Sequence, residues 1–197
     1  MIEFKYGGDE LYARMERAVE RVNERLRKTV SILESANIPH AVVGGHAVRA
    51  WVAQVDEAAV RNTRDVDILI RPDDLERVIQ AMSDSGFSYR QTAGVDMFVE
   101  HPDASARDAV HLVLCGQMIR PDDFEPNPDL EPLIRADNFT TISLESLVRM
   151  KLNSFRDKDR VHVRDMISLG LVDATWLDRF PLGIRARLQR LLDDPNG

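Results

Sequence analysis

The sequence is poor in cysteine and in long apolar runs. Cys115 is the single cysteine among 197 residues, so no internal disulfide can form and an oxidising compartment is not supported. No apolar run approaches the roughly 20 residues that a membrane-spanning helix needs, and residues 1–17 lack the apolar stretch of a secretion signal. We therefore expect a soluble, cytoplasmic protein that does not contact the membrane.

Positive charge is also scarce. Lysine and arginine total 26 against 33 for aspartate and glutamate, which gives a formal net charge of −7 at pH 7. Because nucleic-acid backbones attract basic surfaces, this balance argues against nucleic acid as a partner. Internal repeats and glycine-serine linkers are absent as well, so the length predicts one core or two small cores that share an interface.

What is present is a mixed pattern of helix and strand. Apolar residues spaced three or four apart, without proline or glycine, predict one long amphipathic helix over residues 9–36. Short apolar runs bounded by turn residues predict strands at residues 40–43, 65–70, 87–92, 95–100 and 109–114. Further helices are expected at residues 47–52, 72–83, 144–155, 157–169 and 182–192.

These elements predict the class α/β (α+β), with a mixed sheet flanked by helices and a C-terminal helical part. Strands and helices are mixed up to about residue 140, and the remainder is helical. We therefore expect an αβ domain over residues 1–138, which includes the long N-terminal helix, and a helical subdomain over residues 139–197.

An Asp-x-Asp motif lies at the second predicted strand. Side chains alternate between the faces of a strand, so Asp65 and Asp67 point the same way. Two adjacent carboxylates repel each other unless a cation or a proton lies between them, and hard ions such as Mg²⁺ are commonly held by such pairs. Taken alone, so short a motif fits a pair at a solvated strand end better than a metal site.

A pair of glycines changes that balance. Gly44 and Gly45 follow the first predicted strand and precede a helix, twenty residues before Asp65. Such a turn lets backbone N–H groups approach a phosphate, and the helix N-terminus adds a favourable partial charge. A phosphate cradle beside a metal-binding pair is what phosphoryl or nucleotidyl transfer requires.

Residues 42–47 (Val-Val-Gly-Gly-His-Ala) and 61–68 (Arg-Asn-Thr-Arg-Asp-Val-Asp-Ile) resemble the nucleotidyltransferase superfamily with a DNA polymerase beta-like core. Within it, the chain is most similar to the aminoglycoside and lincosamide nucleotidyltransferases and to the abortive-infection toxin nucleotidyltransferases. The resemblance implies a nucleotidyltransferase-like fold, in which Gly44 and Gly45 line a nucleoside triphosphate and Asp65 and Asp67 bind magnesium ions.

The sequence departs from the superfamily pattern at two positions. Gly45 stands where many members have a serine. The antibiotic-modifying branch also tends to have a glycine at this position. His111 stands where active members have a third carboxylate on a neighbouring strand. A neutral imidazole is a poor Mg²⁺ ligand but can act as a base, so His111 is the expected proton acceptor. Asp108, three residues earlier, would face the other side of the sheet.

Charged residues crowd into residues 151–165 of the helical part. On composition alone, a solvated helix with surface ion pairs explains them. The resembled families carry a similar pattern in the helices that close over the nucleotide, which implies that Lys151 and Arg156 contact the triphosphate. For Lys158 and Asp159, an ion pair that anchors the two halves of the molecule fits equally well.

The expected function is a magnesium-dependent nucleotidyltransferase. It would move an NMP group from an NTP, with ATP as the expected donor, to a hydroxyl of a small-molecule or protein acceptor. The alternative is a catalytically degraded nucleotide-binding protein that acts as a regulatory or toxin-antitoxin partner, because His111 replaces the third acid. The sequence also allows a homodimer formed through the predicted helix at residues 9–36.

Overall fold

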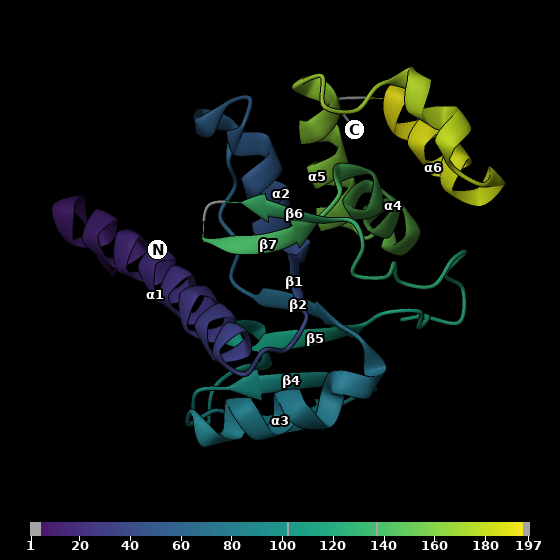
Figure 1. Cartoon of the computed structure of the whole chain (residues 1–197). Coiled ribbons are helices and arrows are strands. Elements are labelled where there is room, and N and C mark those ends of the chain that lie inside the picture. Colours follow the sequence, from purple (N-terminus) through teal and green to yellow (C-terminus); the bar gives the residue numbers. More distant parts are fainter. Residues whose placement is uncertain (1–4, 102, 137, 195–197) are drawn as a thin grey trace.

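The computed structural model describes residues 5–101, 103–136 and 138–194. Its strands are β1 (Ala41–Val43), β2 (Val66–Ile70), β3 (Ser88–Thr92), β4 (Val95–Val99), β5 (Val110–Leu114), β6 (Leu133–Ala136) and β7 (Phe139–Ile142). Its helices are α1 (Gly8–Ser35), α2 (Gly44–Ala53), α3 (Leu75–Asp84), α4 (Leu144–Ser154), α5 (Asp157–Ser168) and α6 (Leu182–Asp193). The strands form one seven-stranded mixed sheet in the order β3-β4-β5-β2-β1-β7-β6 (Figure 1).

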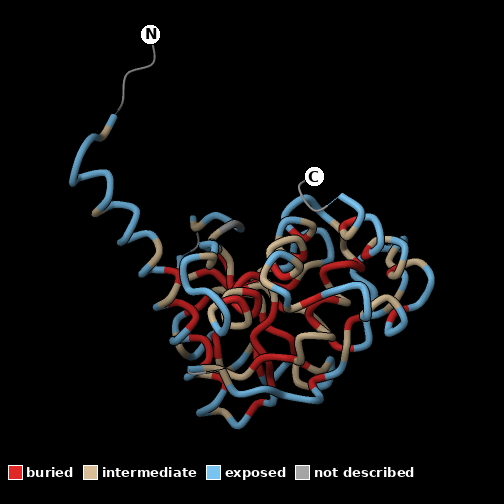
Figure 2. Tube along the Cα trace, turned by 90° about the horizontal axis from the view of Figure 1, so that it is seen from above, coloured by how far each residue is buried: buried red, intermediate tan, exposed pale blue. Residues whose placement is uncertain are grey.

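The sheet is covered on both faces, which explains why its central strands are apolar on both sides. On β2, Ile68 and Ile70 pack into a core with α1 and α3, whereas Leu69 packs into a second core with the C-terminal helices. Strands buried on both faces read as continuous apolar runs. The C-terminal half of α1 belongs to the first core, while its N-terminal half extends away from the body (Figure 2).

The register of three central strands brings the predicted site together. β1 and β2 are antiparallel and align Val43 with Asp67, while β2 and β5 are parallel and align Asp67 with His111. Side chains at aligned positions of neighbouring strands lie on the same face of a sheet. The end of β1, the second aspartate and the histidine are therefore direct neighbours.

The C-terminal helices pack together around one core with β1 and α2. The hydroxyl of Ser143 accepts a hydrogen bond from the N–H of Ser146 at 3.1 Å, so Ser143 caps the N-terminus of α4. Phe155, in the left-handed conformation with φ +47°, separates α4 from α5. Within the described residues, no helix is both long and apolar enough to cross a membrane.

The predicted fold class is confirmed, and the predicted elements are present with small shifts in their ends. The second strand begins at Val66 rather than Asp65, and α2 begins directly at Gly44. The β6–β7 hairpin was not predicted, because each strand has only four residues, too few for a clear alternating pattern, and β6 lies at the exposed edge of the sheet. β7 continues the sheet beyond residue 138, and the division at that residue stays a prediction.

Candidate active site

The glycine turn is shaped by side chains of residues 61–67, here called the acidic segment because it contains Asp65 and Asp67. Gly44 has φ +64°, and a Cβ atom there would lie 1.8 Å from Oδ2 of Asp67. A Cβ atom on Gly45 would lie 2.5 Å from Oγ1 of Thr63. Both positions therefore require glycine, and both glycines also line a large cavity at the N-terminus of α2. The first-turn N–H groups of a helix have no intrahelical partner and are available to an anion.

The two aspartates and the histidine form one cluster. Asp65, Asp67 and His111 each offer a ligand atom, and these atoms lie within 4.8 Å of one another. Asp65 accepts hydrogen bonds from Oγ1 of Thr63 at 2.8 Å and from Nζ of Lys158 at 3.3 Å. Burial acts to raise the pKa of the Asp65 carboxyl, but Lys158 and Thr63 outweigh it and hold this pKa below its ordinary value.

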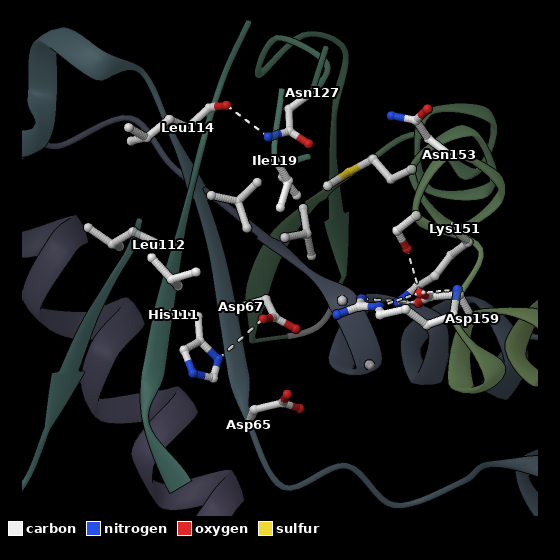
Figure 3. Close-up of a pocket in the computed structure, with 18 of the residues that line it drawn as sticks. Asp65, Asp67, His111, Leu112, Leu114, Ile119, Asn127, Lys151, Asn153 and Asp159 are labelled. Atoms are coloured by element: carbon white, nitrogen blue, oxygen red, sulfur yellow. Dashed lines mark hydrogen bonds and ion pairs between the residues drawn. The ribbon is translucent and has the colours of Figure 1, made fainter. Parts of the chain in front are cut away.

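His111 is held between the backbone and Asp67. Its Nε2 lies 3.0 Å from the carbonyl oxygen of Ala106, and its Nδ1 lies 3.6 Å from Oδ1 of Asp67 (Figure 3). The contact with Asp67 raises the pKa of His111 against the opposing effect of burial. The histidine thus lies at the third position of the cluster. Asp108 lies instead in a short 3-10 helix before β5, where it pairs with Arg64.

The opposite wall of the cavity carries a buried ionic network. Asp159 is fully buried and accepts hydrogen bonds from Nζ of Lys151 at 3.0 Å and from Nε of Arg156 at 2.7 Å. The hydroxyl of Ser154 donates to it as well. Burial acts to raise the pKa of Asp159, but its basic partners hold it far below its ordinary value. The structure thus pairs Lys151 and Arg156 with Asp159, and both still line the cavity.

Two ion pairs connect the helical part to the acidic segment. Lys158 on α5 forms an ion pair with Asp65. This pair joins the two halves of the molecule, which is one of the two roles that the sequence left open for Lys158. Arg61 pairs with Asp165, also on α5. The ion pairs of Asp159, by contrast, stay within the helical part.

The cavity between these walls has a volume of about 1030 Å³ and two unlike ends. The charged end contains the cluster and the basic residues, whereas the other end is lined by apolar residues that include Val113, Met150 and Ile119, the last of which is labelled in Figure 3. Asn127 and Asn153 also lie there, and sequence reasoning missed both. The side-chain amide of Asn153 accepts a hydrogen bond from the N–H of Phe124 and donates one to the carbonyl of Glu125, so it holds the segment between β5 and β6 against α4. These partners are 28 and 29 residues away in the chain, and no local pattern signals them.

Thr63 is a further residue whose role the sequence did not reveal. It packs against Gly45 and donates its hydroxyl proton to Asp65, and it therefore orients the first carboxylate. The only available signal was its position two residues before that carboxylate, where a threonine is common in turns.

The fold and the site define a nucleotidyltransferase-like protein. Residues 10–152 match the model of a family described as uncharacterised nucleotidyltransferase, and the chain belongs to this family. The superfamily predicted from the glycine and aspartate motifs is thereby confirmed. Among proteins with curated descriptions, none matches the chain.

Solved structures similar to the chain include the following three. An antigenic nucleotidyltransferase-like protein from Paracoccidioides brasiliensis has a TM-score of 0.55 and 20% identity over 88% of each chain, which shows a shared fold. The antibiotic-resistance factor ANT(2'')-Ia has a TM-score of 0.45 and 12% identity over 91% of this chain and 84% of its own. JHP933 from Helicobacter pylori has a TM-score of 0.44 and 18% identity over 90% and 76%.

Proposed function

We propose that the protein is a divalent-metal-dependent nucleotidyltransferase that moves an NMP group from an NTP to a hydroxyl group and releases pyrophosphate. The observation that supports this most directly is the convergence of Asp65, Asp67 and the glycine turn on one wall of a single cavity. The expected ion is Mg²⁺, the expected donor is ATP, and the acceptor class is a small molecule or a protein. The cytoplasmic location and the homodimer stay predictions.

The donor set fits a divalent ion. Carboxylate oxygens of Asp65 and Asp67 are the ligands that hard cations prefer, and His111 lies within reach of the same position. When bound, the ion neutralises charge on the triphosphate that side chains alone cannot. The chain itself holds the two carboxylates on one side of β2 and offers the first turn of α2 to the phosphates.

The helical wall supplies the cationic counterpart. Three cations face the cavity there, Lys151, Arg156 and Lys158, against the single carboxylate of Asp159. Asp159 is buried and paired with Lys151 and Arg156, so it fixes the positions of both cations at the cavity wall. We assign Lys151 and Arg156 to the triphosphate, with Arg156 as the bidentate donor and Lys151 as a point charge.

Calorimetric titration with each of the four NTPs, with and without Mg²⁺, tests the proposal. We expect binding that depends on the metal and is lost in the double variant Asp65→Asn with Asp67→Asn. Asp108→Asn is the matched control, because this carboxylate pairs with Arg64 outside the cluster and its loss should leave binding intact. Binding that ignores both the metal and the double variant would overturn the metal site and the enzyme assignment with it.

A second candidate function is a nucleotide-binding protein without turnover, acting as a regulatory or toxin-antitoxin partner. The observation that favours it is His111, which occupies the position aligned with Asp67 where active members have a third acid. A screen of hydroxyl acceptors for pyrophosphate release separates the two candidates. Pyrophosphate release that requires Asp65 and Asp67 supports the transferase. If the protein binds NTP but releases no pyrophosphate with any acceptor, the second function is supported.

A further inference from the structure

The imidazole of His111 has one nitrogen committed to the backbone and the other turned toward the carboxylates. A carbonyl oxygen only accepts hydrogen bonds, so the contact between Nε2 and the oxygen of Ala106 at 3.0 Å places the ring proton on Nε2. In the neutral ring, Nδ1 then presents its lone pair. This atom lies 3.6 Å from Oδ1 of Asp67, and the His111 ring belongs to the cluster that includes Asp65 (Figure 3).

This arrangement matches the way proteins prepare a histidine to bind a metal. A metal-binding imidazole usually donates its other N–H to a carbonyl or a carboxylate, which fixes both the tautomer and the direction of the ring. Here the carbonyl of Ala106 performs that task. The histidine also lies on β5, directly opposite Asp67 in the parallel register, so two paired strands hold both groups. A proton acceptor would need the same Nδ1 atom to face the acceptor hydroxyl rather than the carboxylates.

We propose that Nδ1 of His111 is the third ligand of the divalent ion held by Asp65 and Asp67, and that the site therefore binds a transition ion such as Mn²⁺ more tightly than the Mg²⁺ expected from the sequence, which it still binds. The inference rests on the proposed function, which places a divalent ion at these aspartates. Mg²⁺ prefers oxygen ligands throughout, whereas first-row transition ions accept imidazole together with carboxylate. Replacing the third acid by histidine thus changes the choice of ion rather than removing the site.

Calorimetric titration with Mn²⁺ and Mg²⁺, without nucleotide, tests the proposal on the wild type and on two variants. His111→Gln removes the imidazole without adding charge, and His111→Asp restores an all-oxygen donor set. We expect His111→Gln to weaken Mn²⁺ binding by at least about tenfold with little change for Mg²⁺. We expect His111→Asp to strengthen Mg²⁺ binding and to reduce the Mn²⁺ to Mg²⁺ affinity ratio by at least about tenfold. If His111→Asp does not fold, as judged by circular dichroism, His111→Gln alone carries the test.

A spectroscopic readout identifies the ligand directly. Pulsed electron paramagnetic resonance of bound Mn²⁺ should show modulation from a coordinated imidazole nitrogen in the wild type and none in His111→Gln. An unchanged affinity ratio in His111→Gln, or the absence of nitrogen modulation in the wild type, overturns the ligand role of His111.

The two proposals fail in different ways. If His111 is not a ligand, binding of either ion is still lost in the Asp65→Asn, Asp67→Asn double variant, and the proposed function stands. If neither ion binds the wild type, or if the double variant binds both ions as well as the wild type does, the metal site fails and the proposed function fails with it.

Discussion

The carboxylate of Asp67 occupies the space that a side chain on Gly44 would need. A Cβ atom on Gly44 would lie 1.8 Å from Oδ2 of Asp67, and the glycine also has φ +64°. The glycine turn and the acidic motif are therefore one packed unit, although the glycines begin α2 and the acidic motif lies at the start of β2. Because Gly44 has no side chain, the carboxylate of Asp67 can occupy its observed position and a phosphate can approach the backbone.

Gly44→Ala should damage both stability and the site. The left-handed conformation alone costs roughly 1–2 kcal/mol for a residue with a side chain. The overlap with Asp67 adds to this cost and displaces the carboxylate, so metal-dependent NTP binding should be lost. Urea unfolding and calorimetry measure the two effects.

Gly86→Ala is the matched control for that prediction. Gly86 has φ +89°, but a Cβ atom there would meet nothing within 4 Å. This variant should show the conformational cost alone and should keep NTP binding. Equal losses of stability in the two variants, with binding retained in both, would contradict the packed unit of Gly44 and Asp67.

Asp159→Asn should destabilise the helical part strongly. The carboxylate is fully buried and faces Lys151, whose side chain is only 6% exposed, so the substitution leaves a buried cation without its countercharge. Breaking such a pair costs about 3–5 kcal/mol of unfolding free energy. Urea denaturation measures it. Asp157→Asn, at a side chain that is 91% exposed, should change the value by less than about 0.5 kcal/mol. A small loss in Asp159→Asn would show that Lys151 finds another partner.

His46 should make the protein less stable in mild acid. Burial, helped by the charge of Arg49, lowers the pKa of His46 to about 4 in the folded state. The unfolded chain has a histidine pKa near 6.5, so between these values only the unfolded state binds the proton. The free energy of unfolding should therefore fall as the pH drops from about 6.5 to 4, by roughly 3 kcal/mol from this residue.

Unfolding curves of the wild type and His46→Gln over this pH range check the prediction, and the variant should show a shallower slope. Burial also lowers the pKa of His162 to about 4, with Lys151 adding to the effect. His162→Gln should therefore remove a second, separate part of the slope, and the double variant should remove both. Parallel pH profiles for the wild type and His46→Gln would contradict the assignment.

Lys158→Met should change metal and nucleotide binding in opposite directions. The ammonium of Lys158 lies 3.3 Å from Oδ2 of Asp65, where it acts as a competing countercharge. Without it, binding of the divalent ion alone should strengthen by about two- to fivefold, as expected for a partly exposed ion pair. NTP binding in the presence of the metal should weaken, because the cavity loses a cation. Calorimetry with the metal alone and then with NTP measures both.

Arg61→Gln is the control for Lys158→Met. Arg61 pairs with Asp165 and so also connects the acidic segment to α5, but it does not contact the metal cluster. This variant should leave binding of the metal alone unchanged. Equal changes in both variants would mean that Lys158 acts only by holding the two parts together.

Local patterns in the sequence were enough to predict most of the elements and the chemistry of one wall. The apolar spacing over residues 9–36 predicted α1, since a helix repeats every 3.6 residues whatever it packs against. The alternation of a strand predicted that Asp65 and Asp67 share a face, and both lie in the cluster with His111. The motifs around Gly44 and Asp65 also indicated the nucleotidyltransferase superfamily, which the family match confirms.

The remaining features depend on contacts between distant segments, and only the tertiary structure decided them. From sequence alone, Asp159 could contact the nucleotide or form an ion pair between the two halves of the molecule. Packing of α4 against α5 directs it instead to Lys151 within the helical part. The direction of the His111 ring is set by the carbonyl of Ala106 and by pairing with β2. The sequence determined which residues carry charge and which are buried, because these are properties of single residues and short repeats. Which charges meet depends on strand register and helix packing, and these form only when the whole core assembles.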